Sequence, residues 1–175
     1  ILFAGGKWVG NYISPELEVP EAHKAVLMQV GGYARDHGHV AEEGINCGID
    51  YFVSGDEVIV TEINARWTGG LFPAEFLRRL DITQPAVAFF DMVPVAQSDV
   101  VRAFQREHLF PAAGDTFAYV PMGFTPFAME IEGAERYFVW QIVVGDFAAF
   151  VEAKRQKLPE DTFPTAELIL QEALS

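Results

Sequence analysis

The chain has 175 residues, 50% of them hydrophobic and 13% aromatic, which is enough for one domain with a substantial core or for two small ones. Its 12 Lys and Arg against 25 Asp and Glu give a formal charge of −13, which repels phosphate backbones and anionic lipids and argues against nucleic acid and membrane as partners. The single cysteine, Cys47, excludes an internal disulfide and fits a reducing compartment, and no apolar run approaches the roughly 20 residues of a membrane-spanning helix. We therefore expect a soluble, cytoplasmic protein.

The first part of the chain is predicted to run from a hairpin into a helix. It begins ILFAGGKWVG, without methionine, which suggests a piece of a longer protein. Residues 1–4 and 7–9 predict a short hairpin around two glycines. Apolar residues at helical spacing predict a helix over Glu21–Asp36, and His37 and Gly38 provide its end.

The middle and last parts of the chain mix strands and helices. Two strands, residues 45–53 and 57–63, are predicted around the turn Ser54-Gly55-Asp56. Helices are then predicted over Pro73–Leu80, Gln84–Phe90 and Ser98–His108. Strand character returns between Asp115 and Val144 in FAYVPMGF, PFAMEI and RYFVWQIVV, with EGAE as a turn. The last two helices are predicted over Phe147–Gln156 and Thr165–Ala173.

This mixture predicts an α+β fold in which an antiparallel sheet packs with helices. We place a domain boundary near residues 92–98, so that residues 1–95 form the first domain and residues 96–175 form a smaller α+β domain. Near the chain end, Lys154, Arg155 and Lys157 are assigned to a solvated helix end, where positive charge is favourable against the helix dipole.

Four polar or charged residues interrupt the two strands at 45–63 and the segment that follows: Asp50, Glu62, Asn64 and Arg66. Glu62 and Asn64 point to the same face of their strand because side chains alternate. A two-residue loop between the strands would put Asp50 on the wrong face. A three-residue loop or an equivalent bulge sets Asp50 opposite Val60 or Glu62. We expect this second arrangement, with the two carboxylates about 4.5 to 8 Å apart.

Two carboxylates and an amide oxygen are hard ligands of the kind that Mg²⁺ takes together with phosphate oxygens and water. Zinc would require His or Cys side chains, and none lies at a useful spacing here. Arg66 continues the same parity beyond the strand, where a guanidinium could hold a phosphate or a developing anion. A partly exposed ion-pair network, with Asn64 in a turn, explains these residues equally well.

The stretch resembles the C-terminal catalytic subdomain of the ATP-grasp superfamily. The likeness rests on an acidic residue on one strand, Asp50, followed about a dozen positions later by the Glu-x-Asn-x-Arg string that begins at Glu62. GNYISPEL, EGINCGIDYFV and EINARWTGGLFPAEFL look like successive segments of amino-acid or peptide ligases in that superfamily. The likeness covers about residues 1–80, and the rest resembles the small domain that follows an ATP-grasp core.

The resemblance implies ATP-dependent ligation, in which a carboxylate takes the γ-phosphoryl group of ATP and an amine, for example of an amino acid or peptide, attacks the acyl phosphate. It makes Asp50, Glu62 and Asn64 the ligands of Mg²⁺ or Mn²⁺ and makes Glu62 and Asn64 contacts to ATP. Arg66 would be the catalytic group beside the transferring phosphoryl group. The turn Trp67-Thr68-Gly69-Gly70 would bind the substrate carboxylate. A plain strand-to-helix connection is the alternative for that turn.

The resemblance also implies a missing partner. ATP-grasp enzymes clamp ATP between two subdomains, and the upstream one, with its lysines, mobile glycine-rich loop and adenine pocket, would precede residue 1. We therefore expect residues 1–175 to fold but to be catalytically silent alone, and to self-associate or capture the missing half in trans. Two other functions stay open: a non-catalytic binding or structural module that keeps the fold, and an ATP-grasp kinase with the same metal site.

Overall fold

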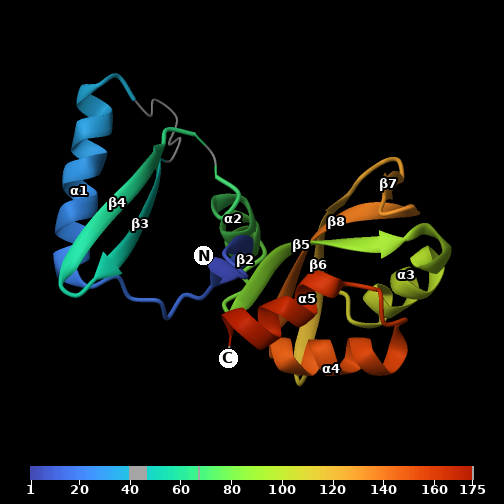
Figure 1. The fold of residues 1–175 in the computed structure, drawn as a ribbon. Helices are drawn as coiled ribbons and strands as arrows, with labels where there is room; N and C mark the ends of the chain where they lie inside the picture. Colours follow the sequence, from blue (N-terminus) through green and yellow to red (C-terminus); the bar gives the residue numbers. More distant parts are fainter. Residues whose placement is uncertain (40–46, 67, 175) are drawn as a thin grey trace. The chain divides into compact units, whose positions relative to one another are not determined.

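The computed structural model describes residues 1–39, 47–66 and 68–174, and it divides into two compact units (Figure 1). One unit comprises residues 16–76, and the other joins residues 1–15 to residues 77–175. The described residues form an α+β structure with antiparallel sheets, as predicted. No helix in this described part is both long and apolar enough to span a membrane.

The unit of residues 16–76 contains one helix and one hairpin, and a second helix begins at its end. Its elements are α1 Glu21–Asp36, β3 Gly48–Ser54, β4 Glu57–Asn64 and α2 Leu71–Arg79. The predicted bounds of α1 are confirmed. The helix ends where the His37 N–H donates to the Tyr33 and Ala34 carbonyl oxygens, and Gly38 then adopts a φ of +95°, which favours glycine.

Helix α1 packs on one face of the β3–β4 hairpin. The rings of His23 and Tyr51 meet edge to face, with centroids 5.9 Å apart. Because neighbouring residues on a strand point to opposite faces, Asp50 lies on the face away from this contact. That face of the hairpin is the one that carries the predicted site.

The second unit is built on a six-stranded antiparallel sheet in the order β1-β2-β5-β8-β6, with β7 paired to β8. Its strands are β1 Leu2–Ala4, β2 Lys7–Ile13, β5 Ala86–Pro94, β6 Phe117–Phe124, β7 Met129–Ile131 and β8 Ala134–Gly145. Its helices are η1 Val95–Gln97, α3 Ser98–Glu107, α4 Phe147–Lys157, α5 Pro164–Leu168 and the π-helix η2 Ile169–Ala173. The predicted N-terminal hairpin, the later strands and the helices after residue 98 are therefore confirmed, with small shifts of their ends.

An aromatic core lies between this sheet and its helices. Helices α4 and α5 run along one side of the sheet (Figure 1). The side chain of Phe150 on α4 is fully buried, and its ring contacts aromatic rings from β5, α3, β6, α4 and the segment before α5, namely Phe89, Phe104, Phe117, Phe147 and Phe163. Burying large apolar side chains is the main stabilising contribution to such a core.

The helix predicted over Gln84–Phe90 is wrong, because this segment enters strand β5, Ala86–Pro94. Both edges of β5 are paired, with β2 and with β8, and successive residues along it are buried on both faces. Its apolar residues therefore form a continuous run rather than an alternating pattern. Periodicity alone does not distinguish such a run from a buried helix. Pro85 directly before the strand would have been the better guide.

The two compact units also differ from the predicted division near residues 92–98. Strand β5 pairs with β8 along its whole length, from Ala86 opposite Val144 to Pro94 opposite Arg136. Residues 86–94 therefore belong to the same sheet as residues 134–145. The divisions between the two units fall instead after residue 15 and after residue 76.

Candidate functional site

The β3–β4 hairpin sets the geometry of the predicted metal site. At its turn Ser54 pairs with Glu57, so the loop has two residues. A β-bulge then shifts the register between Tyr51 and Asp50, which places Asp50 directly opposite Glu62. The prediction that these carboxylates share one face is confirmed, and the bulge, not a three-residue loop, produces it. Paired residues of this kind have Cβ atoms about 4.5 to 5.5 Å apart.

Hydrogen bonds join three residues at the bulge. Asn64 is buried, with 7% of its surface exposed, and its Nδ2 donates to Asp50 Oδ2 over 3.2 Å. The hydroxyl of Thr61 donates to the main-chain oxygen of Asp50 over 3.1 Å, which steadies the bulged strand. Asp50 is half-buried, whereas Glu62 is exposed. The amide nitrogen of Asn64 therefore orients the Asp50 carboxylate and leaves Asn64 Oδ1 as an acceptor.

The turn after β4 abuts the same end of the hairpin. The Arg66 N–H donates to the Asn64 carbonyl oxygen over 2.8 Å, and the Arg66 side chain is exposed. Thr68 packs so closely on Gly48 that a Cβ at position 48 would collide with the Thr68 methyl group. Gly48 pairs with Asn64, so Thr68 lies beside the site.

Thr68 also begins helix α2. Its carbonyl oxygen accepts from the Leu71 N–H over 3.1 Å, and its hydroxyl accepts from the same N–H over 3.3 Å. This is how a threonine caps a helix. Around Gly69 no heavy atom lies within 4 Å of the place where a Cβ would stand, so its backbone is open to approach. Trp67 lies outside the described residues.

The arrangement suits a hard cation. Two facing carboxylates repel each other, and a divalent ion between them would offset that repulsion. No group of three His, Cys, Asp or Glu side chains forms a metal cluster within residues 1–39, 47–66 and 68–174. Asp50, Glu62 and Asn64 therefore offer an incomplete ligand set of two carboxylates and an amide, which water or phosphate oxygens would have to complete.

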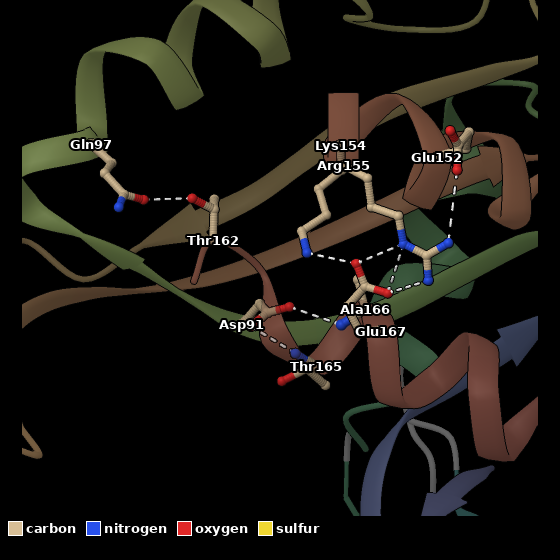
Figure 2. A network of polar contacts seen from close by, with 9 residues as sticks. All are labelled: Asp91, Gln97, Glu152, Lys154, Arg155, Thr162, Thr165, Ala166 and Glu167. Atoms are coloured by element: carbon tan, nitrogen blue, oxygen red, sulfur yellow. Dashed lines mark hydrogen bonds and ion pairs between the residues drawn. The ribbon is translucent and has the colours of Figure 1, made fainter. Parts of the chain in front are cut away.

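A second polar network lies in the unit of residues 77–175 (Figure 2). Asp91 on β5 is 1% exposed, and its carboxylate accepts from the N–H groups of Thr165 over 3.2 Å and Ala166 over 3.1 Å. Burial raises the pKa of Asp91 to about 7, against the opposing effect of these donors and of the Met92 N–H. Asp91 therefore caps α5 from the sheet, a role that no local sequence pattern indicates.

The same network joins α4 to α5 (Figure 2). Lys154 Nζ contacts Glu167 Oε1 over 2.8 Å, and Arg155 Nη2 contacts Glu167 Oε2 over 2.6 Å. Burial acts to raise the pKa of Glu167, but hydrogen bonds from Arg155 and Lys154 hold it below its usual value. Lys154 is 1% exposed, so its assignment to a solvated helix end is wrong. The buried ammonium group of Lys154 is paired with the Glu167 carboxylate on α5 instead of being solvated by water.

The resemblance noted in the sequence receives no independent test from known proteins. A comparison of the chain with family models, with curated proteins and with solved structures finds no match.

Proposed function

We propose that this chain is the metal-holding part of an ATP- and Mg²⁺-dependent ligase that joins a carboxylate to an amine through an acyl phosphate. The observation that carries the proposal is the pairing of Asp50 with Glu62 at a β-bulge, with Asn64 on the same face and hydrogen-bonded to Asp50. This is the geometry that the Glu-x-Asn-x-Arg string requires if it holds a cation.

In the proposed reaction an oxygen of the substrate carboxylate attacks the γ-phosphorus of ATP, the bond to the β,γ-bridging oxygen breaks, and ADP leaves. The amine then attacks the carbonyl carbon of the acyl phosphate, and phosphate leaves. Bound Mg²⁺ would neutralise charge on the β- and γ-phosphates during the first step. Asp50, Glu62 and Asn64 Oδ1 would hold it.

Arg66 and the turn that follows it would bind the phosphoryl group and the substrate carboxylate. The guanidinium of Arg66 would stabilise the transferring phosphoryl group, because it offers charged donors in a fixed fork. The open backbone at Gly69, together with Thr68 and Gly70, would accept the substrate carboxylate. The exposure of Glu62 and Arg66 fits a wall that a second subdomain covers when ATP is bound.

Turnover by the full-length enzyme that carries this chain tests the proposal. ADP release is followed over a panel of amino acids and short peptides offered as carboxylate and as amine. Glu62→Gln should lower kcat by about two to three orders of magnitude or more, because the charge that holds the metal is lost while the side-chain shape is kept.

Glu57→Gln is the matched control. It makes the same change at the start of the same strand, where Glu57 pairs with Ser54 beside the turn, and it should leave kcat unchanged. Near-normal ligation by Glu62→Gln would refute the assigned role. Phosphoryl transfer without use of the amine would favour the kinase, and an enzyme that holds the metal without any turnover would favour the non-catalytic module.

A further inference from the structure

A pocket of about 220 Å³ opens between α3 and β6, in the unit that joins residues 1–15 to residues 77–175. The residues that matter in its lining are Arg102, Gln105 and Arg106 from α3, Leu109 after it, and Tyr119 and Phe124 from β6. The surface that the pocket presents is almost wholly apolar, and two of the residues that line it are arginines.

Two arginines at this pocket carry positive charge. Arg102 and Arg106 stand one helical turn apart with exposed side chains, and neither forms an ion pair with any residue that the structure describes. Their neighbour Glu107 is occupied by Lys157, over 2.6 Å. Like charges at this spacing destabilise a helix slightly. In a chain with 25 acidic and 12 basic residues, an unpaired arginine pair beside a pocket points to an anionic ligand.

A neutral polar pair lies at the inner wall. Tyr119 is 1% exposed, and its hydroxyl accepts from Gln105 Nε2 over 2.7 Å. Burial, with the nearby charge of Asp91, holds the pKa of Tyr119 well above its usual value, so the hydroxyl keeps its hydrogen. Within the described residues this hydroxyl makes no other hydrogen bond.

The pocket is held in place by the backbone. The Tyr119 N–H donates to the His108 carbonyl oxygen over 2.7 Å, and the Phe110 N–H donates to the Tyr119 carbonyl oxygen over 3.0 Å. These bonds tie the end of α3 to β6 on both sides of Leu109. A pocket whose walls are already ordered loses less entropy when it binds a ligand.

We propose that this pocket binds a small organic carboxylate, with the carboxylate at Arg102 and Arg106 and an apolar body between Leu109 and Phe124. A pocket of about 220 Å³ is smaller than the roughly 300 to 1,000 Å³ of pockets that hold drug-sized ligands, so a small molecule suits it. Arginine suits a carboxylate because its donors match both oxygens. The proposal does not depend on the ligase activity, because the pocket uses none of the residues assigned to it.

Titration of residues 1–175 with sodium benzoate and sodium isovalerate, followed by ¹H–¹⁵N spectra, tests this inference. At least one of these carboxylates should shift the resonances of Arg102, Arg106, Leu109 and Phe124 and saturate in the millimolar range or below. Benzyl alcohol matches the apolar body of benzoate without its charge, and inorganic phosphate supplies charge without an apolar body. Both should bind at least about tenfold more weakly.

Substitutions test whether carboxylate binding depends on the arginine pair or on surface charge in general. Arg102→Gln and Arg106→Gln should each weaken carboxylate binding about three- to tenfold, whereas Arg79→Gln, which removes an exposed charge at the end of α2, should not change it. Leu109→Trp should fill the pocket and abolish binding, and Val100→Trp, at an exposed position on α3 outside the lining, is its control.

Four results would overturn the inference: no saturation by either carboxylate, equal affinity for benzyl alcohol, tighter binding of phosphate than of both carboxylates, or equal losses in Arg79→Gln and the pocket variants. Because turnover is not measured, none of them bears on the ligase proposal.

Discussion

Asp91→Asn removes a buried carboxyl group whose ionisation the fold opposes. The folded pKa is raised from 3.8 to about 7, so the folded chain binds a proton that the unfolded chain has already lost between these pH values. The contribution of Asp91 to stability is therefore full below about pH 4 and is lost as pH rises through about 7. A shift of about 3 pKa units corresponds to about 4 kcal/mol at 1.36 kcal/mol for each unit.

The measured quantity is the free energy of unfolding of the Asp91→Asn variant minus that of the wild type, from pH 4 to pH 7.5. Asn cannot ionise, so this difference should rise by about 4 kcal/mol between pH 4 and pH 7, where the folded wild type keeps a proton that its unfolded chain has lost. Urea unfolding is followed by amide resonances of β5 and β8, which report on the unit that contains Asp91. The Asp91 ¹³Cγ shift gives the titration midpoint directly.

Asp99→Asn on α3 serves as control, since it removes a carboxylate that water already solvates. It should change stability by no more than about 0.5 kcal/mol at any pH. A difference between Asp91→Asn and wild type that stays constant from pH 4 to pH 7.5 would refute the reasoning. It would mean that the N–H groups of Met92, Thr165 and Ala166 outweigh desolvation and keep Asp91 ionised.

Two further substitutions test contacts around the site and the second network. Gly48→Ala should destabilise the β3–β4 hairpin by about 1–3 kcal/mol, because the new Cβ meets the Thr68 methyl group, and adding Thr68→Ser should recover most of this loss in thermal unfolding. If Thr68→Ser recovers nothing, the collision is not the cause. Lys154→Ala should cost about 2–4 kcal/mol in urea unfolding, because a buried stem and a charge partner of Glu167 are lost together, while Arg155→Ala should cost less because Arg155 is exposed. Equal costs would contradict the burial argument.

The hairpin shows how far sequence reasoning reaches. Side-chain parity left two arrangements for Asp50, and the expected one, with Asp50 on the same face as Glu62, is the one that the structure contains. The position of the bulge could not be predicted, because the turn itself has two residues and the shift occurs three pairs further along the ladder. It depends on local bonds such as the one from Thr61 to the Asp50 main chain.

Contacts between distant elements escaped prediction for a different reason. Asp91 sits in an apolar run and Lys154 in a basic one, and in both cases the partner lies on α5, many positions away in sequence. Local composition describes Lys154 as a surface residue, whereas the helix that covers it is seen only in the fold. The same holds for Arg102 and Arg106, because the sequence does not show the pocket that they line.

The most direct test of the proposed metal site uses Mn²⁺ as a paramagnetic substitute for Mg²⁺. Added to residues 1–175 with a non-hydrolysable ATP analogue, Mn²⁺ should broaden amide resonances of residues 48–50 and 62–64 before any others. Glu62→Gln should remove this selective broadening, and Glu57→Gln should keep it. Broadening centred on other acidic surface residues, or equal broadening in both variants, would contradict the account.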